Sequence, residues 1–97
     1  MFDYIKLMQN MYNHDERVVA NDTVNNIKID TCLADDMGKD YETGLCVDGC
    51  WYIIEDYDTK KEAKKGHQKY VDMILKKELK EVTDIYNSFN YTEIKYE

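Results

Sequence analysis

Residues 47–60 read Val-Asp-Gly-Cys-Trp-Tyr-Ile-Ile-Glu-Asp-Tyr-Asp-Thr-Lys, and this stretch decides the fold. Asp48-Gly49 is a strong signal for a β-hairpin turn of type I′, because that turn needs positive φ at both central residues. The apolar and aromatic run after the turn has the composition of a strand. Asp58 and Thr59 then precede a pattern typical of an amphipathic helix. The stretch therefore predicts a hairpin whose second strand leads directly into a helix.

The turn also sets the register of the predicted hairpin, which consists of residues 41–47 and 50–57. Val47 opposes Cys50, and counting back places Thr43 opposite Ile54; opposed side chains share a face of the sheet. The more apolar face is the expected core face: Tyr41, Thr43, Leu45, Val47, Cys50, Tyr52 and Ile54. The other face carries Glu42, Gly44, Cys46, Trp51, Ile53 and Glu55. We expect a second element or a partner to cover Trp51 and Ile53.

A long helix is predicted after the hairpin. Thr59-Lys60-Lys61-Glu62 matches the capping box that starts many helices. An apolar stripe of helical period follows at Ala63, His67, Tyr70, Val71, Ile74 and Leu75, and continues at Leu79, Val82, Ile85, Tyr86 and Phe89. The stripe is compatible with one helix or with two broken near residues 77–80. Gly66 is expected to let the helix approach the sheet closely, with His67 packed partly beneath it.

The remaining segments complete the predicted fold. Residues 2–12 have helical spacing and predict a short N-terminal helix, and residues 17–20 form a short β-type run before a turn at Asn21-Asp22. A strand from Val24 alternates, with Ile27, Ile29, Thr31 and Leu33 facing inward. Residues 91–97 are a last edge strand or an ordered tail. The prediction is one α+β domain over residues 1–97: a three- to four-stranded antiparallel sheet packed against a long C-terminal helix, with a short N-terminal helix.

Charge is unevenly distributed along the 97-residue chain, whose net charge is −7. Residues 1–58 hold 13 acidic and 4 basic residues, a net −9, whereas residues 59–82 hold 8 basic and 4 acidic residues, a net +4. The overall sign disfavours direct binding to nucleic-acid phosphate, although the local lysine run leaves that alternative open. No apolar run approaches the roughly 20 residues of a membrane span, so no membrane partner is expected. The first residues lack a signal-peptide pattern, and three cysteines then favour reduced thiols in a cytoplasm.

Acidic residues converge in the predicted strand order, from the loop at residues 35–40 and from both hairpin strands. Paired carboxylates can perform acid–base chemistry or bind a hard cation, but no calcium-loop motif is present. The cluster is therefore interpreted as a solvated acidic rim or as an anionic face that imitates nucleic-acid phosphate. Together with Trp51 it forms the candidate partner interface: Asp35, Asp36, Asp40, Glu42, Trp51, Glu55 and Asp56.

Metal binding and catalysis have weaker signals. Cys32, Cys46, Cys50 and His67 supply the residue types of a Cys₃His zinc site, but the expected register puts Cys46 and Cys50 on opposite faces, and the usual C-x₂-C spacing is missing. A Cys–His nucleophile pair would also need an orienting group, which the sequence does not identify. We therefore expect no metal, no cofactor and no catalytic residue, so the protein is predicted not to be an enzyme.

Three short motifs carry a family resemblance: Tyr41-Glu42-Thr43-Gly44, Tyr57-Asp58-Thr59-Lys60-Lys61-Glu62-Ala63 and Gly66-His67. Over about residues 40–75 the chain resembles a group of small phage and prophage proteins of Gram-positive bacteria. The resemblance implies an accessory protein acting in the cytoplasm of the bacterial host cell, and such acidic proteins include anti-CRISPR inhibitors.

The resulting hypothesis is a non-enzymatic inhibitor that binds a bacterial defence effector, such as a Cas-type nuclease or complex, through its acidic face, with no direct contact to nucleic acid. The alternative is a structural or assembly accessory protein of the phage particle, self-associating as a homodimer or larger homo-oligomer through Trp51 and Ile53.

Overall fold

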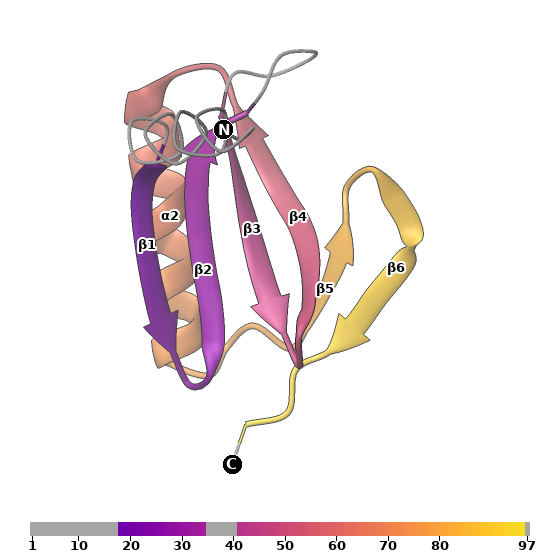
Figure 1. The fold of residues 1–97 in the computed structure, drawn as a ribbon. Coiled ribbons are helices and arrows are strands. Elements are labelled where there is room, and N and C mark those ends of the chain that lie inside the picture. Colours follow the sequence, from indigo (N-terminus) through magenta and orange to yellow (C-terminus); the bar gives the residue numbers. More distant parts are fainter. Residues whose placement is uncertain (1–17, 35–40, 97) are drawn as a thin grey trace, which may run out of the picture.

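Four strands form one antiparallel sheet in the order β1-β2-β3-β4, and helix α2 packs on one face of it (Figure 1). The structure is a computed structural model and describes residues 18–34 and 41–96. In chain order the elements are β1 (Val18–Val24), β2 (Ile27–Leu33), β3 (Tyr41–Val47), β4 (Cys50–Tyr57), α2 (Lys60–Leu75), β5 (Glu81–Asp84) and β6 (Asn87–Glu93). The predicted α+β class and the four-stranded antiparallel sheet are confirmed. The predicted N-terminal helix at residues 2–12 lies outside the described residues.

Two tight turns set the sheet register. Asp48 and Gly49 have φ values of 52° and 83°, which confirms the predicted type I′ turn between β3 and β4. Asn25 and Asn26 have φ values of 52° and 66° and form the corresponding turn between β1 and β2. The predicted turn at Asn21-Asp22 is wrong, because these residues continue β1 and pair with Asp30 and Ile29 of β2.

A β-bulge in β4 changes the predicted face of Glu55. Leu45 opposes Tyr52 as expected, but Gly44 opposes Ile53 and Thr43 opposes Glu55, so Ile54 is an extra residue without a partner on β3. The predicted pairing of Thr43 with Ile54 is therefore wrong. Glu55 shares the helix-covered face with Thr43, whereas Trp51 and Ile53 keep their predicted positions on the opposite face.

Helix α2 begins as predicted and ends earlier than predicted. The Thr59 hydroxyl accepts a hydrogen bond from the backbone N–H of Glu62 at 3.1 Å, which confirms the N-cap. The helix stops at Leu75, where Lys77 has a φ of 58° and the N–H of Glu78 donates to the carbonyl of Met73. This arrangement is a Schellman motif, in which a left-handed residue reverses the chain direction.

The predicted continuation of the helix to residue 89 is wrong. Residues 81–93 form the β5–β6 hairpin instead, and α2 therefore lies in mid-chain (Figure 1). Val82, Thr83 and Tyr91 belong to residue types that favour strands. The hairpin is anchored to β4 by the N–H of Ile85, which donates to the carbonyl of Ile53 at 2.8 Å. Tertiary pairing with an existing strand thus overrides the helical spacing of the apolar residues.

The hydrophobic core lies between α2 and the sheet and extends to the β5–β6 hairpin. It comprises Ile27, Ile29, Leu45, Val47, Tyr52, Val71, Ile74, Val82 and Ile94. The inward direction predicted for Ile27, Ile29 and Thr31 is confirmed. In the part of the chain that the structure describes, no helix is long and apolar enough to cross a membrane.

Candidate functional site

An aromatic patch occupies the sheet face that α2 does not cover. Trp51 and Ile53 of β4 extend over Gly44 of β3, where a Cβ atom would lie 3.3 Å from Ile53 Cδ1 and 3.4 Å from Trp51 Cε3. The glycine therefore lets both side chains lie flat on the sheet. Trp51 nevertheless remains 48% exposed. About half of the Trp51 surface is thus exposed on this face and can contact a partner.

Two carboxylates lie on the same face and are joined by a tyrosine from the second hairpin. Glu42 and Asp56 are cross-strand partners on β3 and β4. The hydroxyl of Tyr86 lies 3.3 Å from Asp56 Oδ2 and 3.5 Å from Glu42 Oε2. Partial burial and the two nearby negative charges raise the pKa of Tyr86. The two carboxylates therefore make the electrostatic potential negative around the exposed ring of Tyr86.

The β5–β6 hairpin connects this cluster to Trp51. The Asn90 side chain donates a hydrogen bond to the carbonyl of Trp51 at 3.4 Å. Tyr86 is next in sequence to Ile85, whose backbone N–H donates to the carbonyl of Ile53 on β4. We name the surface formed by Glu42, Trp51, Ile53, Asp56 and Tyr86 the acidic–aromatic face. The lysines at positions 60, 61, 64 and 65 of α2 are exposed on the other side of the sheet. The acidic–aromatic face and the basic helix surface are thus separated by the thickness of the fold.

The predicted interface residues do not all lie on one surface. Glu42, Trp51 and Asp56 lie on the acidic–aromatic face, whereas Glu55 points toward α2 because of the bulge. Asp35, Asp36 and Asp40 lie outside the described residues. Sequence reasoning missed Tyr86, since residues 79–89 were interpreted as helix. The strand-forming composition of residues 81–92 was the signal that could have placed it.

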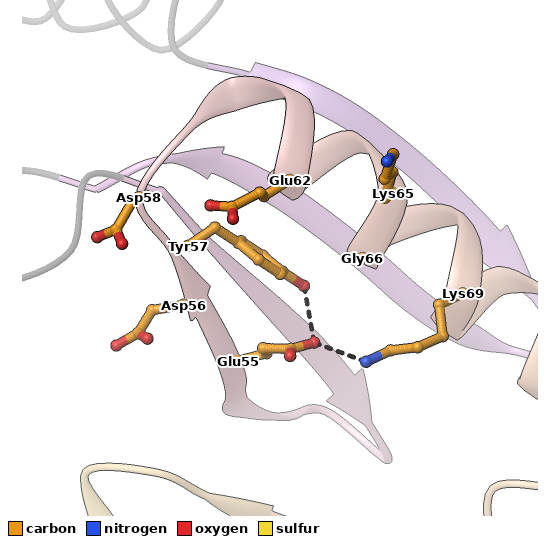
Figure 2. A pocket seen from close by; sticks show the side chains of 8 residues that line it. All are labelled: Glu55, Asp56, Tyr57, Asp58, Glu62, Lys65, Gly66 and Lys69. Carbon is orange, nitrogen blue, oxygen red and sulfur yellow. Dashed lines mark hydrogen bonds and ion pairs between the residues drawn. The ribbon is translucent and has the colours of Figure 1, made fainter.

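A cleft of about 430 Å³ opens between the end of β4 and the first turns of α2. Its lining residues are Glu55, Asp56, Tyr57, Asp58, Glu62, Lys65, Gly66 and Lys69 (Figure 2). Glu55 and Lys69 point toward each other at 2.9 Å across the cleft, and the Tyr57 ring lies against Gly66 (Figure 2). The predicted close approach at Gly66 is confirmed, because a Cβ there would overlap the phenol of Tyr57.

Glu55 in this cleft accepts hydrogen bonds from three side chains. Burial raises its pKa, but hydrogen bonds from Lys69, Tyr70 and Tyr57 outweigh burial, and the pKa is lowered. Burial and the Glu55 charge raise the pKa of Tyr57 to about 12. Glu55 is therefore an ionised structural carboxylate and Tyr57 a neutral donor at physiological pH. Neither group has the pKa near 7 that suits a general base.

A chain of polar side chains leads from the cleft beneath α2. Tyr57 contacts Thr43, Thr43 contacts Thr31, and Thr31 contacts His67, which is 3% exposed. The other ring nitrogen of His67 lies 2.7 Å from Asp22 on β1. The predicted packing of His67 under the helix is confirmed. The Asp–His–Thr sequence has the residue order of a hydrolytic triad, but Thr31 is completely buried and cannot reach a substrate.

The thiols and His67 do not form a metal site. Cys46 lies on the acidic–aromatic face and Cys50 on the opposite face, as the register predicted, while His67 is engaged by Asp22 and Thr31. Within residues 18–34 and 41–96, no three His, Cys, Asp or Glu side chains are arranged to hold a metal ion. Comparison of the chain with protein-family models, with curated proteins and with solved structures finds no match.

Proposed function

We propose that the protein is a non-enzymatic inhibitor that binds a bacterial defence effector, of the Cas nuclease type, and occupies a basic channel that otherwise holds nucleic acid. The observation that carries the proposal is the acidic–aromatic face, where Glu42, Asp56 and Tyr86 are in contact and Trp51 is exposed on the same face of the sheet. The bacterial phage setting rests on the resemblance over residues 40–75.

The composition of the face supports binding to a basic protein surface. Tyr and Trp are enriched among the residues that dominate binding energy, because they bury a large area at small entropic cost. Carboxylates placed beside them offer acceptors to arginine and lysine. Glu42 and Asp56 lie side by side on neighbouring strands and thus present two negative charges at short spacing, as a nucleic-acid backbone does.

Charge separation supports one orientation of binding. Helix α2 packs on the other face of the sheet, and its lysines at positions 60, 61, 64 and 65 are exposed. In the field of a basic channel the molecule turns its acidic side inward and its basic side toward solvent. Complementary charge of this kind raises the association rate and makes it sensitive to ionic strength.

The test uses two matched charge reversals. Phage plating is measured in bacteria that carry each of a panel of Cas-type effectors, with and without the protein. We expect the wild-type protein to restore plating against at least one effector, the Glu42→Lys/Asp56→Lys variant to lose this effect, and the Lys64→Glu/Lys65→Glu control to retain it. Inhibition of no effector, or equal inhibition by wild type and the Glu42→Lys/Asp56→Lys variant, would contradict the proposal.

A second candidate is an assembly protein of the phage particle, and exposed aromatic residues favour it. Phe89 is 91% exposed and Tyr91 is 63% exposed on β6. Side chains of this kind, when exposed together, mark interaction surfaces. Sedimentation analysis over a wide concentration range separates the two functions: self-association that Trp51→Ala and Phe89→Ser both abolish favours assembly, and a stable monomer favours the inhibitor.

A further inference from the structure

A continuous polar chain runs beneath α2 from one carboxylate to another. Its five contacts are Asp22 Oδ2 to His67 Nε2 at 2.7 Å, His67 Nδ1 to Thr31 Oγ1 at 2.7 Å, Thr31 Oγ1 to Thr43 Oγ1 at 2.5 Å, Thr43 Oγ1 to Tyr57 Oη at 3.0 Å, and Tyr57 Oη to Glu55 Oε1 at 3.2 Å. The contact between Tyr57 and Glu55 is the longest of the five hydrogen bonds. Each needs one proton between its two heavy atoms.

Counting the protons shows a deficit when the imidazole is neutral. Both ends of the chain are carboxylates, which accept hydrogen bonds and do not donate. Thr31, Thr43 and Tyr57 contribute one proton each, and a neutral histidine contributes one more, so four protons serve five contacts. One contact would then bring two acceptor lone pairs together, and the cost is largest at the three inner contacts, which are buried. An imidazolium contributes two protons and fills all five contacts.

We infer that the folded protein holds His67 as an imidazolium cation, and that this charge is set by Glu55 at the far end of the chain. The arrangement then has a single direction: Tyr57 donates to Glu55, Thr43 to Tyr57, Thr31 to Thr43, and His67 donates to both Thr31 and Asp22. The buried cation is balanced by the Asp22 carboxylate. In the described part of the chain, no buried side-chain nitrogen or oxygen lacks a partner.

The fifth proton belongs on His67 rather than on either carboxylate. Glu55 receives hydrogen bonds from Lys69, Tyr70 and Tyr57 that lower its pKa, so it stays ionised. The Asp22 side chain is 52% exposed to water, which stabilises its charge. Among the described residues, the groups facing the chain are Asp22 from β1, the neutral hydroxyls of β2 and β3, Tyr57 and Glu55 from β4, and Lys69 and Tyr70 from α2.

The test is the ¹⁵N spectrum of the His67 ring at about pH 7.5, one unit above the ordinary titration of histidine. A His14→Gln background leaves one imidazole to observe, because the sequence has two histidines. We expect both ring nitrogens to be protonated in this background. A spectrum in which either nitrogen is unprotonated, in the folded protein at this pH, would overturn the inference.

Two substitutions at a distance from His67 test the proton count itself. Tyr57→Phe leaves three contacts, which two threonines and a neutral histidine can fill, and Thr43→Val leaves two contacts at His67, which Thr31 and a neutral histidine can fill. Each should leave His67 with a single ring proton at about pH 7.5. Tyr70→Phe is the control, since it removes a donor to Glu55 that is outside the chain and should leave His67 charged. A His67 that stays doubly protonated in folded Tyr57→Phe or Thr43→Val would refute the count; if Tyr57→Phe fails to fold, Thr43→Val decides.

Discussion

Gly66→Ala provides a sharp test of how α2 is seated on the sheet. At most helical positions this change stabilises a protein by about 1 kcal/mol, because alanine has the better helix propensity. Here the added Cβ would overlap the hydroxyl and two ring carbons of Tyr57. The ring cannot move aside freely, since its hydroxyl is bound to Thr43 at 3.0 Å and to Glu55 at 3.2 Å. The substitution must displace either the ring or the helix.

The expected loss follows from these contacts. Overpacking costs about 1–3 kcal/mol, and loss of the two hydrogen bonds costs about 1 kcal/mol each, against the gain of about 1 kcal/mol in propensity. The net destabilisation is therefore about 2–4 kcal/mol, which lowers the melting temperature of a chain this size by roughly 10 °C or more.

Urea and thermal unfolding of purified Gly66→Ala measure this loss. Lys64→Ala on the exposed side of the same helix is the control and should change stability little. Combining Gly66→Ala with Tyr57→Leu removes the overlapping atoms, so the second substitution should make the alanine much less harmful. A Gly66→Ala protein that is as stable as wild type, or more stable, would refute the proposed close packing of Tyr57 on Gly66.

Three further predictions concern the helix end, the tyrosines and the open face. Lys77→Gly should raise the free energy of unfolding by about 0.5–1 kcal/mol in urea titrations, because glycine adopts a φ of 58° without strain; a destabilised variant would contradict the Schellman ending. Burial and Glu55 raise the pKa of Tyr57 to about 12, so the stability that is present below about pH 10 should decrease as the pH rises toward 12, and Tyr57→Phe should lose less in circular-dichroism melts over that range. Trp51→Ala should cost about 2 kcal/mol in partner or self-association and less in folding stability, and the reverse ranking in calorimetry would make Trp51 a core residue.

Local signals in the sequence were sufficient for the centre of the fold. Asp48-Gly49 determines a type I′ turn because both residues must adopt positive φ, and the turn in turn fixes the first pairs of the β3–β4 hairpin. Thr59 was recognisable as an N-cap because its partner, the N–H of Glu62, is three residues away. These features depend on neighbours in sequence, and the structure has them where they were predicted.

Features that depend on distant residues were not predictable in this way. The end of α2 has Lys77 where a glycine would have marked the stop, so the apolar spacing of residues 79–89 was interpreted as helix. The bulge at Ile54, which turns Glu55 toward α2, has no sequence signal of its own. Tyr86 reaches Glu42 and Asp56 only because β5 is anchored to β4. The acidic–aromatic face was therefore predicted in part, without the hairpin that completes it.

The buried chain at His67 illustrates the same limit. The sequence predicted that His67 packs under the helix, because it follows Gly66 on the apolar stripe. Its partners come from β1, β2 and, through Thr31, from β3 and β4. Such a chain requires the register of four strands at once, and a pattern of residue types along one segment does not contain that information.

The most direct test of the proposed function is the binding affinity of the two charge-reversal variants for the effector that the wild-type protein inhibits. We expect Glu42→Lys/Asp56→Lys to weaken binding by about tenfold or more, since each lost pair of charge-assisted contacts is worth more than about 1 kcal/mol. Lys64→Glu/Lys65→Glu should bind as wild type does, and salt should weaken only the wild-type and control complexes strongly. Equal affinity of wild type and Glu42→Lys/Asp56→Lys, with both folded, would contradict a binding role for the acidic–aromatic face.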